Sequence, residues 1–600
     1  MILPISSKGV FLVTNAFQSI LEQGPEEQKR KVQDAVGGAN LPEISTRSSN
    51  KANKKTIPIL RRAKKLIDTH DYSGAAKLAM RALDLDEDFS LANHIMAIAL
   101  EKLGHLSKSL EFYERAWRLD PTDGEVYQNL ALVAWKLDML PAAEKFLQLF
   151  LELQPGNPNG VINLGGVLRD LGRFDEAVEL IRAAIYGHQN HAMLWNALAT
   201  VLLESGQPEQ ALTFYDEALR LDPQSARIWH NTAYAAGLAG DRARAAEAGE
   251  KALAMTTSPE DRSTIEYGLS QAYLALGRLE EGWKAHMARF DPKGVVNMLN
   301  AIDAPRWDGE EDITGKRVLL MGEQGLGDEV LYMNAAQDFI DAVGPKGRVD
   351  FTVERRLMPM VERTYAPKTL VRHLTVNREG RQIRLIPDIT DWSDYDFYVP
   401  MGNAVAAHRK TIADFPDHKG YLVADPEKVK AMQNAVAALP AGPKIGLCWK
   451  SMVMNANRSK YFSPFDAWKP VLQTPGAVFV SMQYGDCADE IAKAQKALGV
   501  TIHELPGLDL KNDLDGVAAA GLALDITIGP MNASTNLAAA HGGMVWFLAS
   551  PDHWPLHSTG TIPWYPMARV FSPKQFGAWD ETMKRVADAL AEETRAKKAA

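Results

Sequence analysis

The sequence has little cysteine, little excess charge of either sign and no long apolar run. Two cysteines among 600 residues are too few for a disulfide framework. No stretch approaches 18 uninterrupted apolar residues, so we expect no membrane span. The net charge of −9 argues against a nucleic-acid partner, which usually needs a basic face. We therefore expect a soluble, cytoplasmic protein without a targeting segment.

Metal-binding patterns are also missing. His541, His553 and His557 lack partners at the spacing of metal ligands, so we expect no metal site. At the other end of the chain, residues 1–22 are compatible with a short amphipathic helix. Residues 23–55 are polar and charged without a hydrophobic face, which predicts a flexible linker.

An internal repeat fills residues 56–290. Candidate turn residues recur every 34 positions, at His70, Gly104, Asp138, Gly172, Gly206 and Gly240. Small residues follow five positions later, at Ala75, Ser109, Ala143, Ala177, Ala211 and Ala245. Small side chains let two helices approach closely, and prolines 121, 155 and 223 end the second helix of three units. This pattern resembles the tetratricopeptide repeat, with a seventh unit displaced by an insertion before Gly277.

Stacked helix pairs of this kind form a superhelix whose concave groove binds extended peptides or partner helices. Asparagines recur at nearly the repeat spacing: Asn93, Asn129, Asn163, Asn196 and Asn231. They are candidates for a ladder that hydrogen-bonds the backbone of a bound peptide. The alternative is that they are solvated or cap their own helices.

The periodicity changes after a turn-rich linker at residues 291–315. Strand and helix patterns then alternate through residues 316–425 and restart in residues 426–600. Such alternation predicts parallel, doubly wound sheets. The sequence therefore predicts two Rossmann-like lobes with a ligand site between them, at the carboxyl ends of the strands.

The stretch "GEQGLGDEV" follows the first strand of this region. No Lys-Ser/Thr pair follows its glycines, so it is not a Walker loop. Gly325 and Gly327 permit a tight turn, and Asp328 and Glu329 begin the next helix. A carboxylate there is either a helix cap, favoured by the dipole, or a general base that faces the cleft.

Two further stretches are suited to an anion. Lys450, Arg458 and Lys460 are three cations on one loop after a strand, suited either to a phosphorylated leaving group or to plain solvation. Asn532, Ser534, Thr535 and Asn536 open a small-residue helix after another strand, as caps or as an anion site. Near the end of the chain, "IPWYPMARVF" supplies Trp564 and Tyr565, which we expect to be packing residues.

The "GLGD" turn and the "STNLAAAHGG" segment together resemble the heptosyltransferase-like group of GT-B glycosyltransferases. With the repeats, the chain is similar to bacterial flagellin glycosyltransferases. The resemblance implies an α-solenoid followed by an α/β GT-B domain. It also implies that Asp328 is the base, that Lys460 binds the donor phosphates, and that Thr535 and Asn536 occupy a Ser-His pair. Met531 stands where that group has an acid, which argues against a heptose donor.

This resemblance implies a metal-independent, inverting protein O-glycosyltransferase. Its acceptor would be flagellin, captured by the repeats and modified on Ser or Thr. Its donor would be a nucleotide sugar, a CMP-linked nonulosonic acid of the pseudaminic acid type, and no other cofactor is expected. Two alternatives remain: an enzyme like O-GlcNAc transferase that uses UDP-GlcNAc, and a non-catalytic scaffold or chaperone with a decayed GT-B domain.

Overall fold

The computed structural model describes residues 50–291, 294, 298–378, 381–451, 456–551 and 553–599. The predicted N-terminal helix and the linker up to residue 49 lie outside these residues. The last residues of the predicted linker, 50–55, belong to a helix instead, because α3 begins at Asn50. The chain divides into two compact units, Met1–Val201 and Leu202–Ala600.

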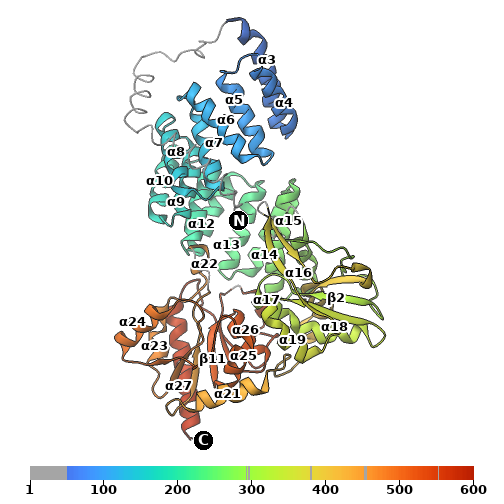
Figure 1. The fold of residues 1–600 in the computed structure, drawn as a ribbon. Coiled ribbons are helices and arrows are strands. Elements are labelled where there is room, and N and C mark those ends of the chain that lie inside the picture. Colours follow the sequence, from blue (N-terminus) through green and yellow to red (C-terminus); the bar gives the residue numbers. More distant parts are fainter. Residues whose placement is uncertain are drawn as a thin grey trace. The chain divides into compact units, whose positions relative to one another are not determined.

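The first unit consists of helical hairpins (Figure 1). Its helices are α3 (Asn50–Asp68), α4 (Tyr72–Leu83), α5 (Ser90–Lys102), α6 (Leu106–Leu119), α7 (Gly124–Lys136), α8 (Leu140–Leu153), α9 (Pro158–Asp170) and α10 (Phe174–Gly187). Helix α11 (Ala192–Glu204) reaches the boundary. The predicted turn residues His70, Gly104, Asp138, Gly172, Gly206 and Gly240 all have positive φ, between 60° and 87°. The small residues five positions later are buried, which confirms the tetratricopeptide repeat.

The second unit starts with the remaining repeat helices. They are α12 (Pro208–Leu221), α13 (Ala226–Leu238), α14 (Arg242–Met255), α15 (Pro259–Ala275) and α16 (Leu279–His286), followed by the 3₁₀ turn η1 (Met287–Phe290). Gly277 has a φ of 78°, as a turn residue of the displaced seventh repeat should.

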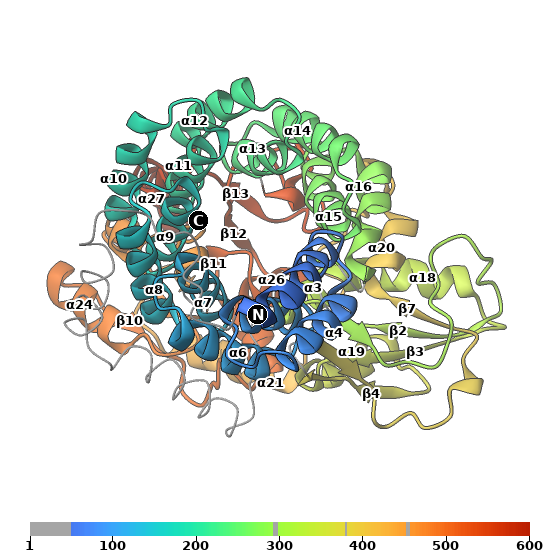
Figure 2. The same cartoon turned by 90° about the horizontal axis from the view of Figure 1, so that it is seen from above.

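A four-stranded parallel sheet follows (Figure 2). Its order is β4 (Leu370–Arg372), β3 (Arg348–Val353), β2 (Arg317–Met321) and β7 (Phe397–Pro400). Its helices are α17 (Leu326–Tyr332), α18 (Ala336–Val343), α19 (Met358–Tyr365) and α20 (Met401–His408). The chain winds outward from β2 to β4 and then returns to β7, so the direction switches between β2 and β7. In doubly wound sheets, ligands bind at the carboxyl ends of the strands beside such a switch.

The second parallel sheet has six strands. Its order is β10 (Ile502–His503), β9 (Val478–Ser481), β8 (Lys444–Leu447), β11 (Ile526–Pro530), β12 (Val545–Leu548) and β13 (Arg569–Phe571). Its helices include α21 (Pro426–Ala437), α24 (Ala488–Leu498), α25 (Leu514–Ala523), α26 (Ala533–Ala540) and α27 (Trp579–Ala599). The switch lies between β8 and β11, which is the strand order of a dinucleotide-binding fold.

A third, small sheet corrects two predictions. It joins β1 (Met298–Asn300) to the antiparallel pair β5 (Leu374–Arg378) and β6 (Arg381–Leu385). The predicted linker 291–315 therefore contributes a strand, and its Trp307 is buried in the core. The antiparallel pair β5–β6 also departs from the parallel sheet predicted for residues 316–425, because β6 pairs with β1 and β5 and not with the first parallel sheet.

Candidate functional site

The turn after β2 presents Asp328 from the start of α17. The Asp328 carboxylate accepts a hydrogen bond from the Gly325 N–H at 3.0 Å and so caps the helix. The side chain is half-buried, so part of it remains accessible. The helix-cap interpretation is therefore confirmed, and the role of Asp328 as a general base stays a prediction.

The surroundings of Asp328 raise the pKa of its carboxyl group to about 6. Desolvation is the largest cause, and the negative charges of Glu323 and Glu329 add to it. The Gly325 N–H opposes the rise by stabilising the charged form. A general base works best when its pKa lies near the operating pH, and Asp328 is close to that condition.

Glu329, the other predicted acid, is placed differently. It is fully buried, and its carboxylate accepts from the Glu354 N–H at 3.0 Å and contacts His373 Nε2 at 2.8 Å. Both oxygens are engaged inside the first lobe. The prediction that Glu329 shares the catalytic role does not fit this position, because an acceptor could not reach it without breaking these contacts.

The beginning of α26 lies against the Asp328 turn. Asn536 Nδ2 donates to the Gly327 carbonyl at 3.0 Å. A Cβ added at Gly327 would come within 3.4 Å of the Ala533 nitrogen and of Asn536 Nδ2. The structure therefore brings together the two stretches that the sequence places on opposite lobes, at the switch points of both sheets.

The four polar residues that open α26 have distinct roles. Asn532 caps the helix by accepting from the Thr535 N–H at 3.3 Å, and its Nδ2 contacts Cys448 Sγ at 3.0 Å. Thr535 donates to the Pro530 carbonyl at 2.6 Å, and Ser534 is buried. Asn536 Oδ1 is buried and has no hydrogen-bond partner among the described residues.

The predicted cluster of cations is not assembled at this place. Lys450 Nζ donates to Glu490 at 2.5 Å and to the Asp486 carbonyl. Lys460 Nζ donates to Glu204 at 2.7 Å, near the end of α11. Arg458 is exposed on the short helix α22 (Ala456–Ser459). Carboxylates pair with both ammonium groups, and the binding of a phosphate by Lys450, Arg458 and Lys460 stays a prediction.

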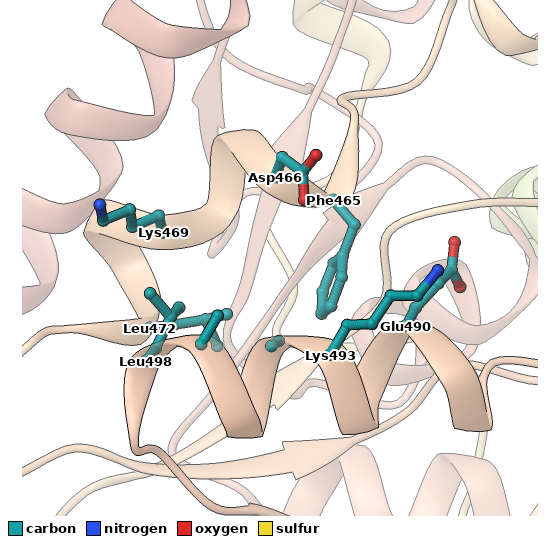
Figure 3. A pocket seen from close by; sticks show the side chains of 9 residues that line it. Phe465, Asp466, Lys469, Leu472, Glu490, Lys493 and Leu498 are labelled. Atoms are coloured by element: carbon teal, nitrogen blue, oxygen red, sulfur yellow. The ribbon is translucent and has the colours of Figure 1, made fainter.

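The cavity next to Lys450 is separate from the Asp328 turn. It has a volume of about 580 Å³ and lies between η6 (Phe465–Trp468), α23 (Lys469–Leu472) and α24. Figure 3 shows Phe465 directed toward α24, where Glu490 and Lys493 lie. Its lining includes no residue of the predicted site, although Glu490 is the partner of Lys450.

The repeat asparagines do not act alike. Asn93 is buried and donates to the carbonyls of Glu87 and Phe89, and so ties down the start of its own helix. Asn129 Nδ2 contacts His94 Nε2 of the preceding repeat at 2.8 Å. Asn163 and Asn231 are half-buried, and Asn196 is buried. A uniform ladder is therefore not seen, since the members differ in burial and in partners.

The sequence did not indicate the residues that hold the Asp328 turn. Buried Arg289 of η1 makes a two-pronged ion pair with Glu323, at 2.8 and 2.9 Å. Glu323 also accepts from the Gly402 N–H at 2.7 Å. Arg384 of β6 donates to the carbonyls of Gly322 and Gln324. A glutamate two residues after a buried strand is the one signal in the sequence.

The aromatic segment is packed as predicted. Trp564 and Tyr565 are both buried, and Trp564 donates to His557 Nε2 at 3.1 Å. Across the described ranges, no group of three or more His, Cys, Asp or Glu side chains is arranged to hold a metal ion. Every helix in the part of the chain that the structure describes is too short or too polar to cross a bilayer.

The raised pKa of Asp328 predicts a stabilising substitution. Asp328→Asn keeps an acceptor for the Gly325 N–H but removes a charge that the folded state disfavours. The pKa of the Asp328 carboxyl group is higher in the folded state than in the unfolded state. The charge therefore lowers the free energy of unfolding more and more as the pH rises through about 4 to 6. We expect the variant to gain about 1–3 kcal/mol at pH 8, and roughly half as much at pH 5. Urea unfolding at both pH values measures this, with the exposed Asp417→Asn as control.

Comparisons with known proteins relate the chain to several groups. The tetratricopeptide repeat family matches residues 162–226. Protein FlbA of Caulobacter vibrioides is 40% identical over 557 residues, which is 93% of each chain. Protein O-mannosyl-transferase TMTC3 of Mus musculus is 26% identical over 178 residues, 27% of this chain and 19% of that protein. The structure of PilW, a type IV pilus biogenesis factor, covers 36% of this chain and 99% of its own, with 18% identity and a TM-score of 0.32.

Proposed function

The chain belongs to the family of Protein FlbA, and we propose that its α/β region is an inverting GT-B glycosyltransferase with Asp328 as the base. The observation that carries this proposal is the position of Asp328. It is a half-buried carboxylate with a pKa of about 6, at the switch point of one sheet. The neighbouring Gly327 carbonyl accepts from Asn536 of α26, which opens at the switch point of the other sheet.

The proposed reaction uses Asp328 on one side and the start of α26 on the other. Asp328 removes the proton of an acceptor Ser or Thr hydroxyl, whose oxygen attacks the anomeric carbon from the face opposite the leaving group. The bond from that carbon to the donor phosphate breaks, and the nucleotide departs with its electron pair. The N–H groups of the first turn of α26 face the phosphate, since a helix N-terminus stabilises negative charge.

The surroundings of Met531 are compatible with an acidic sugar. The Met531 sulfur contacts His553 Nε2 at 3.2 Å. Burial lowers the pKa of His553 to about 4, so neither side chain carries a charge at neutral pH. An anionic nonulosonic acid would be repelled by a carboxylate at this place. We therefore propose a CMP-linked nonulosonic acid as donor and flagellin, recruited by the repeats in the cytoplasm, as acceptor.

Donor choice is the first test. Calorimetry with CMP and with UDP, followed by transfer assays with each nucleotide sugar, separates the alternatives. We expect binding of CMP and transfer of the acidic sugar. Binding of UDP with transfer of GlcNAc would favour the enzyme like O-GlcNAc transferase, and no binding of any nucleotide would favour the scaffold.

The pH dependence of the reaction is a second test. Because a protonated Asp328 cannot accept the hydroxyl proton, kcat/KM should fall about tenfold per unit as the pH drops below about 6. Above this value the rate should reach a plateau. Initial rates between pH 4.5 and 8.5 give the profile, and a rate that is unchanged from pH 5 to pH 8 would argue against Asp328 as the base.

A further inference from the structure

The last repeat reaches into the proposed active site. Arg289 of η1 lies under the β2–α17 turn, almost fully buried. Besides its ion pair with Glu323, its Nη2 donates to Asn403 Oδ1 at 2.6 Å and its Nη1 donates to the His286 carbonyl at 3.1 Å. Asn403 in turn donates to the Trp307 carbonyl at 2.7 Å. The guanidinium therefore links the repeat region, α20 and the turn in one network.

The turn that this network holds is strained. Gln324 has a φ of 60°, in the left-handed region that a residue with a side chain rarely adopts. Such conformations persist only where the surrounding contacts impose them. Here Arg384 holds the carbonyls of Gly322 and Gln324, and Arg289 holds the side chain of Glu323 between them. Gly402 lacks a side chain where a Cβ would come within 2.5 Å of Glu323 Oε1, which permits this close approach.

Other residues of the last repeat face the same turn. His286 is buried, and burial with the nearby Arg289 charge lowers its pKa well below its ordinary value, so it is neutral. His286 Nε2 accepts from Gln324 Nε2 at 3.4 Å. Tyr267 of α15 packs on His286, with ring centroids 5.4 Å apart. Burial raises the pKa of Tyr267, and the negative charge of Asp328 adds to the rise.

We propose that the last repeat is part of the transferase site, and that Arg289 is a positioning residue which acts through Glu323 to hold the turn that presents Asp328. This proposal rests on the proposed function. A buried ion pair adds little net stability compared with apolar residues of similar size, so stability alone does not account for it. The need to hold a strained turn in one conformation accounts for the buried pair.

The charges around Asp328 give the proposal a measurable signature. Five titratable groups interact with its charge: Glu323 from the turn, Glu329 and Tyr332 from α17, Tyr267 from α15 and Tyr565 from the second lobe. The ion pair with Arg289 offsets part of the negative charge of Glu323. Without Arg289, an uncompensated Glu323 makes Asp328 harder to ionise.

Kinetics of the full-length chain test the positioning role. In Arg289→Met, kcat should fall about tenfold or more at temperatures well below unfolding, since small misplacements of a catalytic group are costly. The pH below which kcat/KM falls should rise by at least about half a unit. Arg289→Lys should recover part of the lost kcat and part of the shift in pH dependence. Arg278→Met is the matched control, because Arg278 of the same repeat pairs with Glu281 in solvent.

The double variant Arg289→Met/Glu323→Gln separates positioning from stability. It removes the unpaired charge, so we expect it to recover thermal stability but not kcat. Full recovery of kcat together with Tm would show that the pair only stabilises the fold. A wild-type kcat and pH profile in Arg289→Met would equally overturn the proposal, while loss of transfer in Asp328→Asn would still support the proposed function.

A thermodynamic cycle tests the same coupling without any sugar transfer. The Tm gain from Asp328→Asn at pH 8 should be larger in the Arg289→Met background than in the wild type, because Glu323 then repels Asp328. Additive effects within error would contradict the link between Arg289 and Asp328. This outcome does not depend on whether the chain is a glycosyltransferase.

Discussion

Replacing Asp328 with Asn is expected to lower the rate of sugar transfer by a factor of about 100 to 10,000, the usual range for loss of a general base. The amide cannot take the acceptor proton, but it keeps the size of the side chain and an oxygen for the Gly325 N–H. The turn and the helix cap should therefore survive. Transfer measured under single-turnover conditions reports the chemical step directly.

The controls for this loss use neighbouring side chains and other readouts. The variant should bind acceptor and nucleotide like the wild type and should be more stable at pH 8. Glu329→Gln should retain more activity than Asp328→Asn, because Glu329 is buried against His373 and the Glu354 N–H. Undiminished transfer by Asp328→Asn would remove Asp328 from the reaction.

The second large effect is expected in the aromatic cluster of the second unit. Trp564→Ala should lower the free energy of unfolding by about 3–5 kcal/mol, the usual cost of deleting a buried tryptophan. Trp564 is fully buried and lies edge-on to Trp283, Trp554 and Phe415. Since Trp283 belongs to α16, the substitution leaves a cavity where the last repeat meets the α/β region.

Urea unfolding followed by circular dichroism measures the loss in Trp564→Ala. Tyr186→Ala is the control, because Tyr186 is 78% exposed, and its effect should stay within about 0.5 kcal/mol. A loss below about 1 kcal/mol for Trp564→Ala would mean that the cluster does not hold these parts together.

Much of the fold could be predicted because its signals are local and periodic. A residue that needs a positive φ recurs every 34 positions, and the structure gives each of these turns that conformation. The alternating strands likewise follow from short apolar runs such as β2 and β11. The strand β1 was missed because three residues in a turn-rich segment carry no such pattern.

The candidate site could be predicted only in part. Asp328 and the start of α26 follow from where strands end, and the Asn536–Gly327 hydrogen bond joins them. The partners of Lys450 and Lys460 could not be predicted, because each lies far away in the sequence. Glu490 is 40 residues from Lys450, and Glu204 is 256 residues from Lys460. Arg289 was missed for the same reason: nothing in a single arginine at the end of a repeat indicates a glutamate 34 residues later.

The intact mass of flagellin after incubation with the full-length chain and a CMP-activated nonulosonic acid tests the central claim most directly. The account predicts that the acceptor gains the mass of whole sugar residues, and that no gain occurs with Asp328→Asn. An acceptor of unchanged mass with the wild-type chain, under conditions where the chain binds both flagellin and the donor, would contradict it.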